Sequence, residues 1–236
     1  MMNIFSYLLF FFISPVLFVQ AWYVRKVTPK LPEPTGIRSG VSGKGESMNL
    51  LIIGDSAAAG VGVDTQSQAL LGQTVALLNE RARVNWSLCA QSGFSTKDIL
   101  DRLKTIKKQD IDVVLISLGV NDVTRFIRVK TWLKQQQALL DFCRNEFSSR
   151  QVLFSLVPPM GDFPALPQPL AWCLGLRSQA FNECLANWLS QEADCQIVDL
   201  GTLLDASQMA ADGFHPGEAI YHHWAKIAVE KMFSNQ

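Results

Sequence analysis

The sequence has little of what several large protein classes require. Its longest basic runs are the pairs Arg25-Lys26 and Lys107-Lys108, and its 21 basic residues are balanced by 21 acidic ones. A surface that binds nucleic-acid backbone is therefore not expected. The five cysteines form no CxxC pair and no Cys/His cluster with zinc spacing, which argues against a metal site. Their odd number favours free thiols in a reducing compartment over a disulfide framework.

Cofactor-binding loops are also missing. Residues 60–62 (GVG) lack the third glycine of a dinucleotide fingerprint, and residues 43–45 (GKG) lack the upstream glycine and the following Ser or Thr of a phosphate loop. Ser56 does not stand in a Gly-x-Ser-x-Gly sequence, because Ala58 takes the place of the second glycine, and this excludes the nucleophile elbow of the α/β-hydrolases. The sequence therefore predicts a protein that works without a cofactor.

The first 24 residues carry no charged side chain. Between Ile4 and Val24 about twenty residues are mostly apolar, enough helix to cross a hydrocarbon layer of about 30 Å. This stretch predicts a transmembrane helix over residues 1–24. A cleaved signal peptide is the alternative, because residues 19–21 (VQA) would suit a peptidase, although the basic n-region of such peptides is missing.

Positive charge is absent before this stretch and gathers after it. The basic residues that follow are Arg25, Lys26, Lys30, Arg38 and Lys44. Since positive charge near a membrane end tends to stay in the cytoplasm, the pattern predicts a single-pass membrane protein whose main domain is cytoplasmic. Export, with that domain held in the periplasm, is the alternative.

Prolines and glycines dominate the next segment. Three prolines lie between positions 29 and 34 and four glycines between positions 36 and 45, with almost no apolar residue among them. This composition is typical of a tether that is stiff at first and then flexible. The sequence therefore predicts a linker over residues 25–48 and a folded domain over residues 49–236.

Apolar runs that are typical of strands alternate with helical patterns throughout the folded domain. The runs at 49–53, 84–88, 112–118, 151–157 and 196–200 are short, and each is followed by a segment with helical spacing. Alternating strands and helices indicate a parallel sheet between two layers of helices. We expect a three-layer α/β/α sandwich around a mostly parallel five-stranded sheet, with functional groups at the carboxyl ends of the strands.

Polar clusters follow the predicted strands, and together they contain the parts of an acyl-transfer site. Ser56, after the first strand, can serve as the nucleophile at the start of a helix. His215 is the natural base, because the other two histidines lie within the last predicted helix. Asp212, three residues earlier, can reach the imidazole Nδ1 and leave Nε2 for the serine. These residues predict a Ser-His-Asp triad.

Donors for a developing oxyanion follow the next two strands. Gly93 can bring a bare backbone N–H close to a ligand, and Asn121 can offer its side-chain amide from the end of the most buried strand. With the Ser56 N–H they would form an oxyanion hole of three donors. One such donor is typically worth about 2.7–4 kcal/mol of the barrier.

These motifs resemble the sequence blocks of the SGNH hydrolases, also called the GDSL esterase and lipase family. The matching residues are, in order, Ser56 within Gly54-Asp55-Ser56, Gly93, Asn121 within Gly119-x-Asn121-Asp122, and Asp212 with His215. The resemblance runs from Leu51 to His215 and departs from the family pattern at Ala57, where leucine is common. It implies a flavodoxin-like SGNH hydrolase fold and esterase or lipase activity through an acyl-serine intermediate.

An apolar, proline-rich segment at 160–172 (MGDFPALPQPLAW) follows the fourth predicted strand. It can either cover the end of the sheet or line the pocket with Phe163, Leu166, Leu170 and Trp172, which would favour an acyl chain over a sugar. We therefore expect a small-molecule or lipid acyl ester as the substrate, with lysophospholipase-like activity. A deacetylase or an acyl thioesterase of the same mechanism is the alternative, followed by a non-catalytic domain that binds lipid at a membrane.

Overall fold

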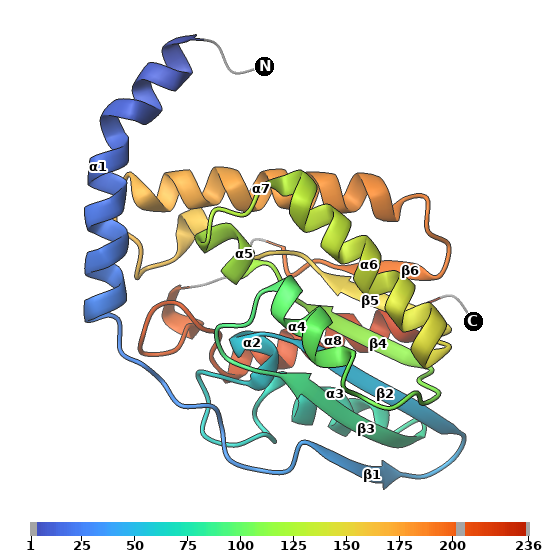
Figure 1. Cartoon of the computed structure of the whole chain (residues 1–236). Helices are drawn as coiled ribbons and strands as arrows, with labels where there is room; N and C mark the ends of the chain where they lie inside the picture. Colours follow the sequence, from blue (N-terminus) through green and yellow to red (C-terminus); the bar gives the residue numbers. More distant parts are fainter. Residues whose placement is uncertain (1–3, 202–205, 235–236) are drawn as a thin grey trace.

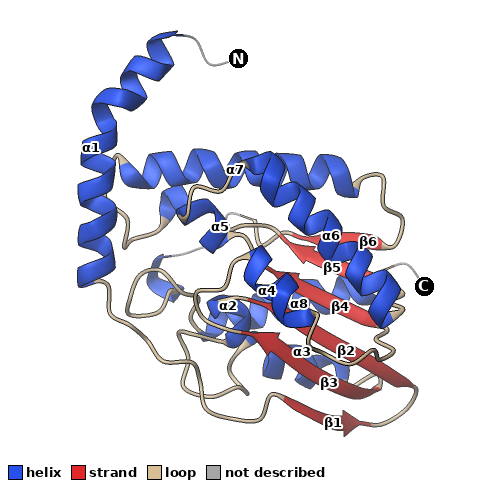
Figure 2. Cartoon of the chain, viewed as in Figure 1, coloured by secondary structure: helices blue, strands red, loops and turns tan. Residues whose placement is uncertain are grey.

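The computed structural model describes residues 4–201 and 206–234. Its centre is a six-stranded sheet in the order β1-β3-β2-β4-β5-β6 (Figures 1 and 2). The strands are β1 Ser39–Gly43, β2 Ser47–Gly54, β3 Arg83–Ala90, β4 Val113–Ser117, β5 Gln151–Ser155 and β6 Cys195–Val198. β1 runs antiparallel to β3, and the other neighbouring pairs are parallel.

Helices connect the strands and cover both faces of the sheet (Figure 2). They are α1 Ile4–Val27, α2 Ser56–Ala59, α3 Leu70–Leu78, α4 Thr96–Leu103, α5 Val120–Thr124, α6 Val129–Phe147, α7 Leu170–Leu189 and α8 Glu218–Phe233. The 3₁₀ turns η1 Met160–Asp162 and η2 Ala206–Gln208 lie in the loops before α7 and α8.

The central strands divide the core into two layers. On β2, Leu51 and Ile53 belong to the cluster with α4, α6 and α7, whereas Leu50 and Ile52 belong to the cluster with α3 and α8. All four side chains are at most 2% exposed. Because successive side chains of a strand point to opposite faces, a continuous apolar strand must be covered on both sides. The result is a three-layer α/β/α arrangement.

The strand order brings three loops to one place. From β2 the chain passes to β3 on one side and later to β4 on the other side. The loops after β2, β3 and β4 therefore meet where the strand order reverses. Ligand sites of open α/β sheets lie outside the carboxyl ends of the strands at such a point.

The sheet has one strand more than the five that we expected. β1 lies within the range expected to be a linker and pairs with β3 along the edge of the sheet. Its sequence, SGVSG, has no apolar run, and Val41 is 56% exposed. A backbone ladder rather than a buried face holds such a strand, so its hydropathy does not reveal it. Gly40 lies close to Trp86, since a Cβ there would be 2.7 Å from the indole ring.

The prediction of a transmembrane helix over residues 1–24 is wrong. Within residues 4–201 and 206–234, no helix has both the length and the apolarity needed to cross a membrane. The later part of α1 makes contacts with protein: Leu17 is 8% exposed and joins the core cluster beside α7. Gln20 donates from Nε2 to Gln168 O at 2.6 Å and accepts from Leu170 N at 3.1 Å. Apolar composition did not distinguish a helix packed on protein from one packed in lipid.

Candidate active site

The first polar corner lies at residues 54–60, directly after β2. Gly54 allows a close approach to β4, since a Cβ there would lie 2.4 Å from Ser117 O. Asp55 caps α2, because its Oδ1 accepts a hydrogen bond from Ala57 N at 3.1 Å. α2 ends after one turn at Gly60, whose φ is 94°. The corner therefore places Ser56 at the start of α2, where the helix does not use its backbone N–H.

His215 meets Ser56 from the loop before α8. Its Nε2 lies 2.8 Å from Ser56 Oγ, and its Nδ1 lies 2.5 Å from Asp212 Oδ2. The other oxygen, Asp212 Oδ1, accepts hydrogen bonds from the backbone N–H groups of Phe214 and His215, each at 3.0 Å. Asp212 thus holds both the backbone and the ring of His215. The structure brings together the three residues that the sequence suggested as a triad.

The Asp212 carboxylate is stabilised in its charged form. The residue is 5% exposed, and burial by itself raises the pKa of the carboxyl group. Hydrogen bonds from the His215 ring and from the N–H groups of His215 and Phe214 outweigh burial, and they leave the pKa of Asp212 below its ordinary value. A charged Asp212 can orient the imidazole and stabilise the positive charge that the ring gains when it accepts a proton.

The candidate oxyanion donors also lie at the carboxyl ends of neighbouring strands. Gly93 follows β3 in a turn with φ of 82°, and no atom lies within 4 Å of the position that a Cβ would take. Asn121 stands in the first turn of α5, after β4. Its Nδ2 donates to Phe94 O at 2.9 Å, and its contact with Asp55 Oδ2 is long, at 3.4 Å. While Phe94 O holds one amide hydrogen, the other makes only this long contact and can be accepted by a substrate oxygen at little cost.

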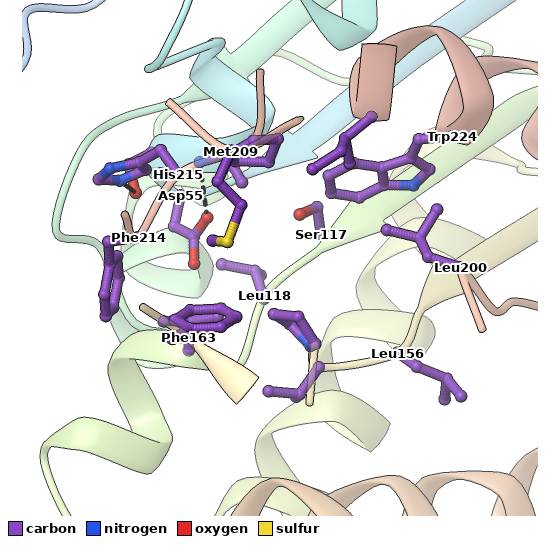
Figure 3. A pocket seen from close by; sticks show the side chains of 17 residues that line it. Asp55, Ser117, Leu118, Leu156, Phe163, Leu200, Met209, Phe214, His215 and Trp224 are labelled. Carbon is purple, nitrogen blue, oxygen red and sulfur yellow. Dashed lines mark hydrogen bonds between the residues drawn. The ribbon is translucent and has the colours of Figure 1, made fainter. Parts of the chain in front are cut away.

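A pocket opens beside Ser56 and His215 (Figure 3). The space inside it is about 620 Å³ when the open solvent at its mouth is included. Figure 3 shows it extending from His215 and Phe214 at one end toward Leu156, Leu200 and Trp224 at the other. Its lining is mostly apolar. Nowhere in the described chain do three His, Cys, Asp or Glu side chains gather as metal ligands would.

The segment at 160–172 contributes one of the four side chains suggested from the sequence. Phe163 lines the pocket, and its ring packs edge-to-face on Phe214 with centroids 5.1 Å apart. Leu166 and Leu170 are buried in the core cluster beside α7, and Trp172 is 43% exposed. The segment therefore covers the end of the sheet and also lends one aromatic ring to the pocket.

Comparison with known families places this geometry in a group of enzymes. The sequence pattern of the GDSL-like lipase/acylhydrolase family matches residues 52–223, a range that includes Ser56, Gly93, Asn121, Asp212 and His215. The chain belongs to this family. The resemblance seen in the sequence is confirmed, and the protein, a GDSL hydrolase, is an enzyme that acts on ester bonds. No curated protein sequence matches the chain.

Solved structures share the fold of this GDSL hydrolase. A member of the lipolytic protein G-D-S-L family from Veillonella parvula is 18% identical, with a TM-score of 0.63 over 80% of this chain and 100% of that one. A psychrotrophic esterase from Pseudoalteromonas sp. is 18% identical, with a TM-score of 0.61 over 80% and 99%. An acetylxylan esterase from Geobacillus stearothermophilus is 18% identical, with a TM-score of 0.60 over 81% and 95%. At these identities the likeness shows the fold alone.

A second carboxyl group of the GDSL hydrolase lies buried beside the nucleophile position. Asp55 is 2% exposed, and burial raises its pKa to about 7, although the hydrogen bond from Ala57 N and the nearby His215 act in the opposite direction. Asp122 adds to the rise by charge repulsion. Burial raises the pKa of Asp122 as well, despite hydrogen bonds from Thr96 N and Oγ1 at 3.1 and 3.0 Å. Asp55 therefore changes its charge near neutral pH.

We expect the Asp55→Asn variant to gain stability relative to the wild type as the pH rises from 5 to 8. The pKa of Asp55 is about 7 in the folded protein against an ordinary value of 3.8, so the folded state binds the proton more tightly. Wild-type stability must then fall as the pH rises through this window. Asparagine has the same shape and does not titrate, so the difference should grow by roughly 2–3 kcal/mol.

Urea unfolding of both proteins at several pH values between 5 and 8 measures this difference. Asp110→Asn, at an exposed position, is the matched control, and its difference from the wild type should not change with pH. A constant difference between Asp55→Asn and the wild type would mean that Asp55 is already charged at pH 5.

The sequence did not predict several residues of the site. Leu156 and Leu200 line the pocket directly after β5 and shortly after β6, so their place at the carboxyl ends of strands was an available signal. Arg125 lies one helical turn after Asn121, which was a second signal. Glu33 reaches the loop after β3 from the proline-rich segment, and no local pattern indicates this contact.

Proposed function

We propose that this GDSL hydrolase is a serine esterase that moves the acyl group of an apolar carboxylic ester first to Ser56 and then to water. The hydrogen-bonded series Ser56 Oγ, His215 and Asp212, with contacts of 2.8 and 2.5 Å, supports the proposal most strongly. It provides a nucleophile, a base and an orienting carboxylate in the arrangement that acyl transfer requires.

In the first half of the reaction, Ser56 Oγ attacks the ester carbonyl carbon while its proton passes to His215 Nε2. The carbonyl oxygen becomes an oxyanion, which the N–H groups of Ser56 and Gly93 and the amide of Asn121 stabilise. The tetrahedral intermediate then collapses: the bond to the alkoxy oxygen breaks, and that oxygen takes the proton from His215. The alcohol leaves, and the acyl group stays on Ser56.

In the second half, water replaces the alcohol. His215 Nε2 takes a proton from the water, the hydroxide oxygen attacks the acyl carbon, and a second oxyanion forms at the same donors. Collapse returns the proton to Ser56 Oγ and releases the carboxylic acid. Neither half involves oxidation or reduction, and the protein ends in its starting state.

The pocket supports an apolar acyl group as the part of the substrate that is recognised. Its apolar lining includes Leu118, Val120, Phe163 and Met209, and its end away from His215 is lined by Leu156, Leu200 and Trp224 (Figure 3). Each methylene buried in such a pocket contributes about 0.8 kcal/mol. An ester with several acyl carbons should therefore bind better than an acetyl ester.

Hydrolysis of p-nitrophenyl esters from acetate to dodecanoate by the purified full chain tests the proposal. We expect kcat/KM to pass through a maximum beyond acetate. Activity confined to acetate would favour a deacetylase, the activity named for the Geobacillus neighbour, whereas faster cleavage of acyl thioesters of equal length would favour a thioesterase. The Pseudoalteromonas esterase is described as inhibited by monoethylphosphonate, so a fluorophosphonate is a suitable active-site label. No hydrolysis and no labelling would refute the proposal.

The Leu156→Trp variant should prefer shorter acyl chains than the wild type. Leu156 is half-buried and lies at the end of the pocket away from His215, so a larger side chain there would shorten the acyl channel (Figure 3). Loss of two buried methylenes costs about 1.6 kcal/mol, or roughly 15-fold in kcat/KM. We expect that loss for octanoate, with acetate changed less than about twofold.

The control for this prediction is Leu176→Trp, the same substitution at a leucine on α7 that is 45% exposed and does not line the pocket. It should leave the chain-length profile unchanged. Equal losses for acetate and octanoate in Leu156→Trp would show that the variant damages the site in general rather than its acyl end.

A further inference from the structure

The peptide group between Ser92 and Gly93 carries one of the proposed oxyanion donors, the Gly93 N–H. This N–H makes no hydrogen bond with any residue that the structure describes. Outside its two chain neighbours, no atom lies within 4 Å of the Cβ position of Gly93, so packing around Gly93 itself does not hold this peptide. A donor contributes to catalysis only when its direction is fixed before the reaction. Other contacts must therefore fix this peptide.

Glu33 holds the preceding peptide group, between Gln91 and Ser92. Its Oε1 accepts a hydrogen bond from Ser92 N at 2.7 Å, across 59 residues of sequence. Its Oε2 accepts from Arg38 Nη2 at 2.5 Å, and Arg38 Nη1 donates to Ala90 O, the last residue of β3, at 3.0 Å. Burial raises the pKa of Glu33, but the bonds from Ser92 and Arg38 outweigh it and lower the pKa, so the carboxylate is charged.

Arg125 holds the following peptide group, between Gly93 and Phe94. Its Nη2 donates to Gly93 O at 2.7 Å, and its Nη1 donates to Asp98 Oδ2 at 2.9 Å. Asp98 is in turn fixed by the capping box with Ser95 at the start of α4. Arg125 therefore ties the Gly93 turn both to Asp98 at the start of α4 and to the end of α5, where Arg125 itself stands.

Arg125 also connects the Gly93 turn to Asn121. The two residues are one turn apart on α5, where Arg125 N donates to Asn121 O at 3.0 Å. The Asn121 amide itself donates to Phe94 O at 2.9 Å. A shift of the Gly93 turn would therefore change the spacing between the two donors that meet the oxyanion.

We propose that Glu33 and Arg125 are positioning residues that form a clamp on the two peptide groups flanking the Ser92–Gly93 peptide, so that the Gly93 N–H and the Asn121 amide point at one oxyanion. The proposal rests on the serine esterase function proposed above. Neither side chain touches the reacting atoms. Loss of either clamp misplaces a donor that acts mainly in the transition state, so kcat falls and KM hardly changes.

The test compares Arg125→Met and Glu33→Leu with the wild type, using p-nitrophenyl butyrate. We expect each variant to lose roughly 10-fold in kcat with KM within about twofold, because a misplacement of about 1 Å at a reacting group can cost up to 100-fold. The conservative variants Arg125→Lys and Glu33→Gln keep a donor and an acceptor, respectively, and should recover most of the rate. The pH profile of kcat should not change in Glu33→Leu, because the hydrogen bonds of Glu33 go to Ser92 and Arg38 and involve neither His215 nor Asp55.

Arg144→Met is the matched control for a structural arginine. Arg144 pairs with Glu192 and Asp194 and is 33% exposed, against 47% for Arg125. Asp194 directly precedes β6, so this cluster lies at the amino end of the strands, opposite to the site. Arg144→Met should lower the unfolding temperature as much as Arg125→Met does, or more, and leave kcat unchanged.

Equal kcat values in Arg125→Met, Glu33→Leu and Arg144→Met would overturn the clamp, as would a rise in KM without a fall in kcat. If Arg125→Met or Glu33→Leu does not fold, the lysine and glutamine variants decide, because the clamp requires their rates to lie close to that of the wild type. Failure of the esterase proposal is distinguishable, since the wild type itself would then show no hydrolysis and no labelling of Ser56.

Discussion

Replacing Ser56 by alanine is expected to lower kcat for p-nitrophenyl butyrate by roughly 10⁴-fold or more and to abolish labelling by a fluorophosphonate. The substitution removes the Oγ atom that lies 2.8 Å from His215 Nε2, and without it no acyl-enzyme can form. The oxyanion donors and the pocket stay in place, so a small residual rate over water should persist. Intact-protein mass spectrometry measures the label, and a burst of p-nitrophenol measures acylation.

The matched control is Ser190→Ala, an exposed serine at the end of α7. It should keep both the burst and the label. The Ser56→Ala variant should unfold at nearly the wild-type temperature, because Ser56 lies at the surface of the pocket rather than in the core. A label that survives in Ser56→Ala would mean that another residue is the nucleophile. A wild type that binds the ester without a burst would indicate a lipid-binding protein instead of an esterase.

The Asn121→Ala variant should lose roughly 10²–10³-fold in kcat, which corresponds to about 2.7–4 kcal/mol of barrier. Its amide is the one side-chain donor in the proposed oxyanion hole, and the bond to Phe94 O at 2.9 Å fixes its direction. KM should change little, because the amide interacts most strongly with the charged oxygen of the transition state. Fluorophosphonate should still label Ser56, only more slowly, since the nucleophile and its base are intact.

The control for this prediction is Asn85→Ala, an exposed asparagine on β3 whose side chain donates to Asn49 Oδ1. It should leave kcat unchanged. An equal effect of the two variants, or a rise in KM alone for Asn121→Ala, would remove Asn121 from the oxyanion hole. Complete loss of labelling with a normal unfolding temperature would instead assign it a role in activating Ser56.

Much of the site could be predicted because its residues follow strands that are easy to recognise. β2 and β4 contain continuous apolar runs, at residues 50–53 and 113–116, and a parallel sheet places whatever follows them at one edge. Ser56 and Asn121 occupy those positions. His215 could be found by elimination, and its spacing from Asp212 suited a carboxylate that reaches the ring. The family blocks contain the same residues, so the strand pattern and the family resemblance predict the same site.

The rest depended on contacts between distant parts of the chain. Glu33 lies in a segment whose prolines and glycines indicate a linker, and its partner Ser92 is 59 residues away. In the later part of α1, Leu17 packs against protein while Phe18 and Val19 are 75% and 61% exposed, and composition alone cannot separate packing on protein from burial in lipid. In both cases the local sequence describes the segment alone, whereas its role is set by what the fold places beside it.

The edge strand β1 has a consequence for the solubility of the protein. β1 pairs with residues 83–87 of β3 and so occupies the backbone N–H and C=O groups on the outer side of that strand. A chain shortened to the domain boundary at residue 49 would leave these groups open and would uncover the Trp86 ring beneath Gly40. Unprotected edges recruit strands from other molecules and lead to aggregation. β1 takes over the edge position, but an edge of five residues with hardly any apolar side chain recruits other strands less readily than an uncovered β3 would.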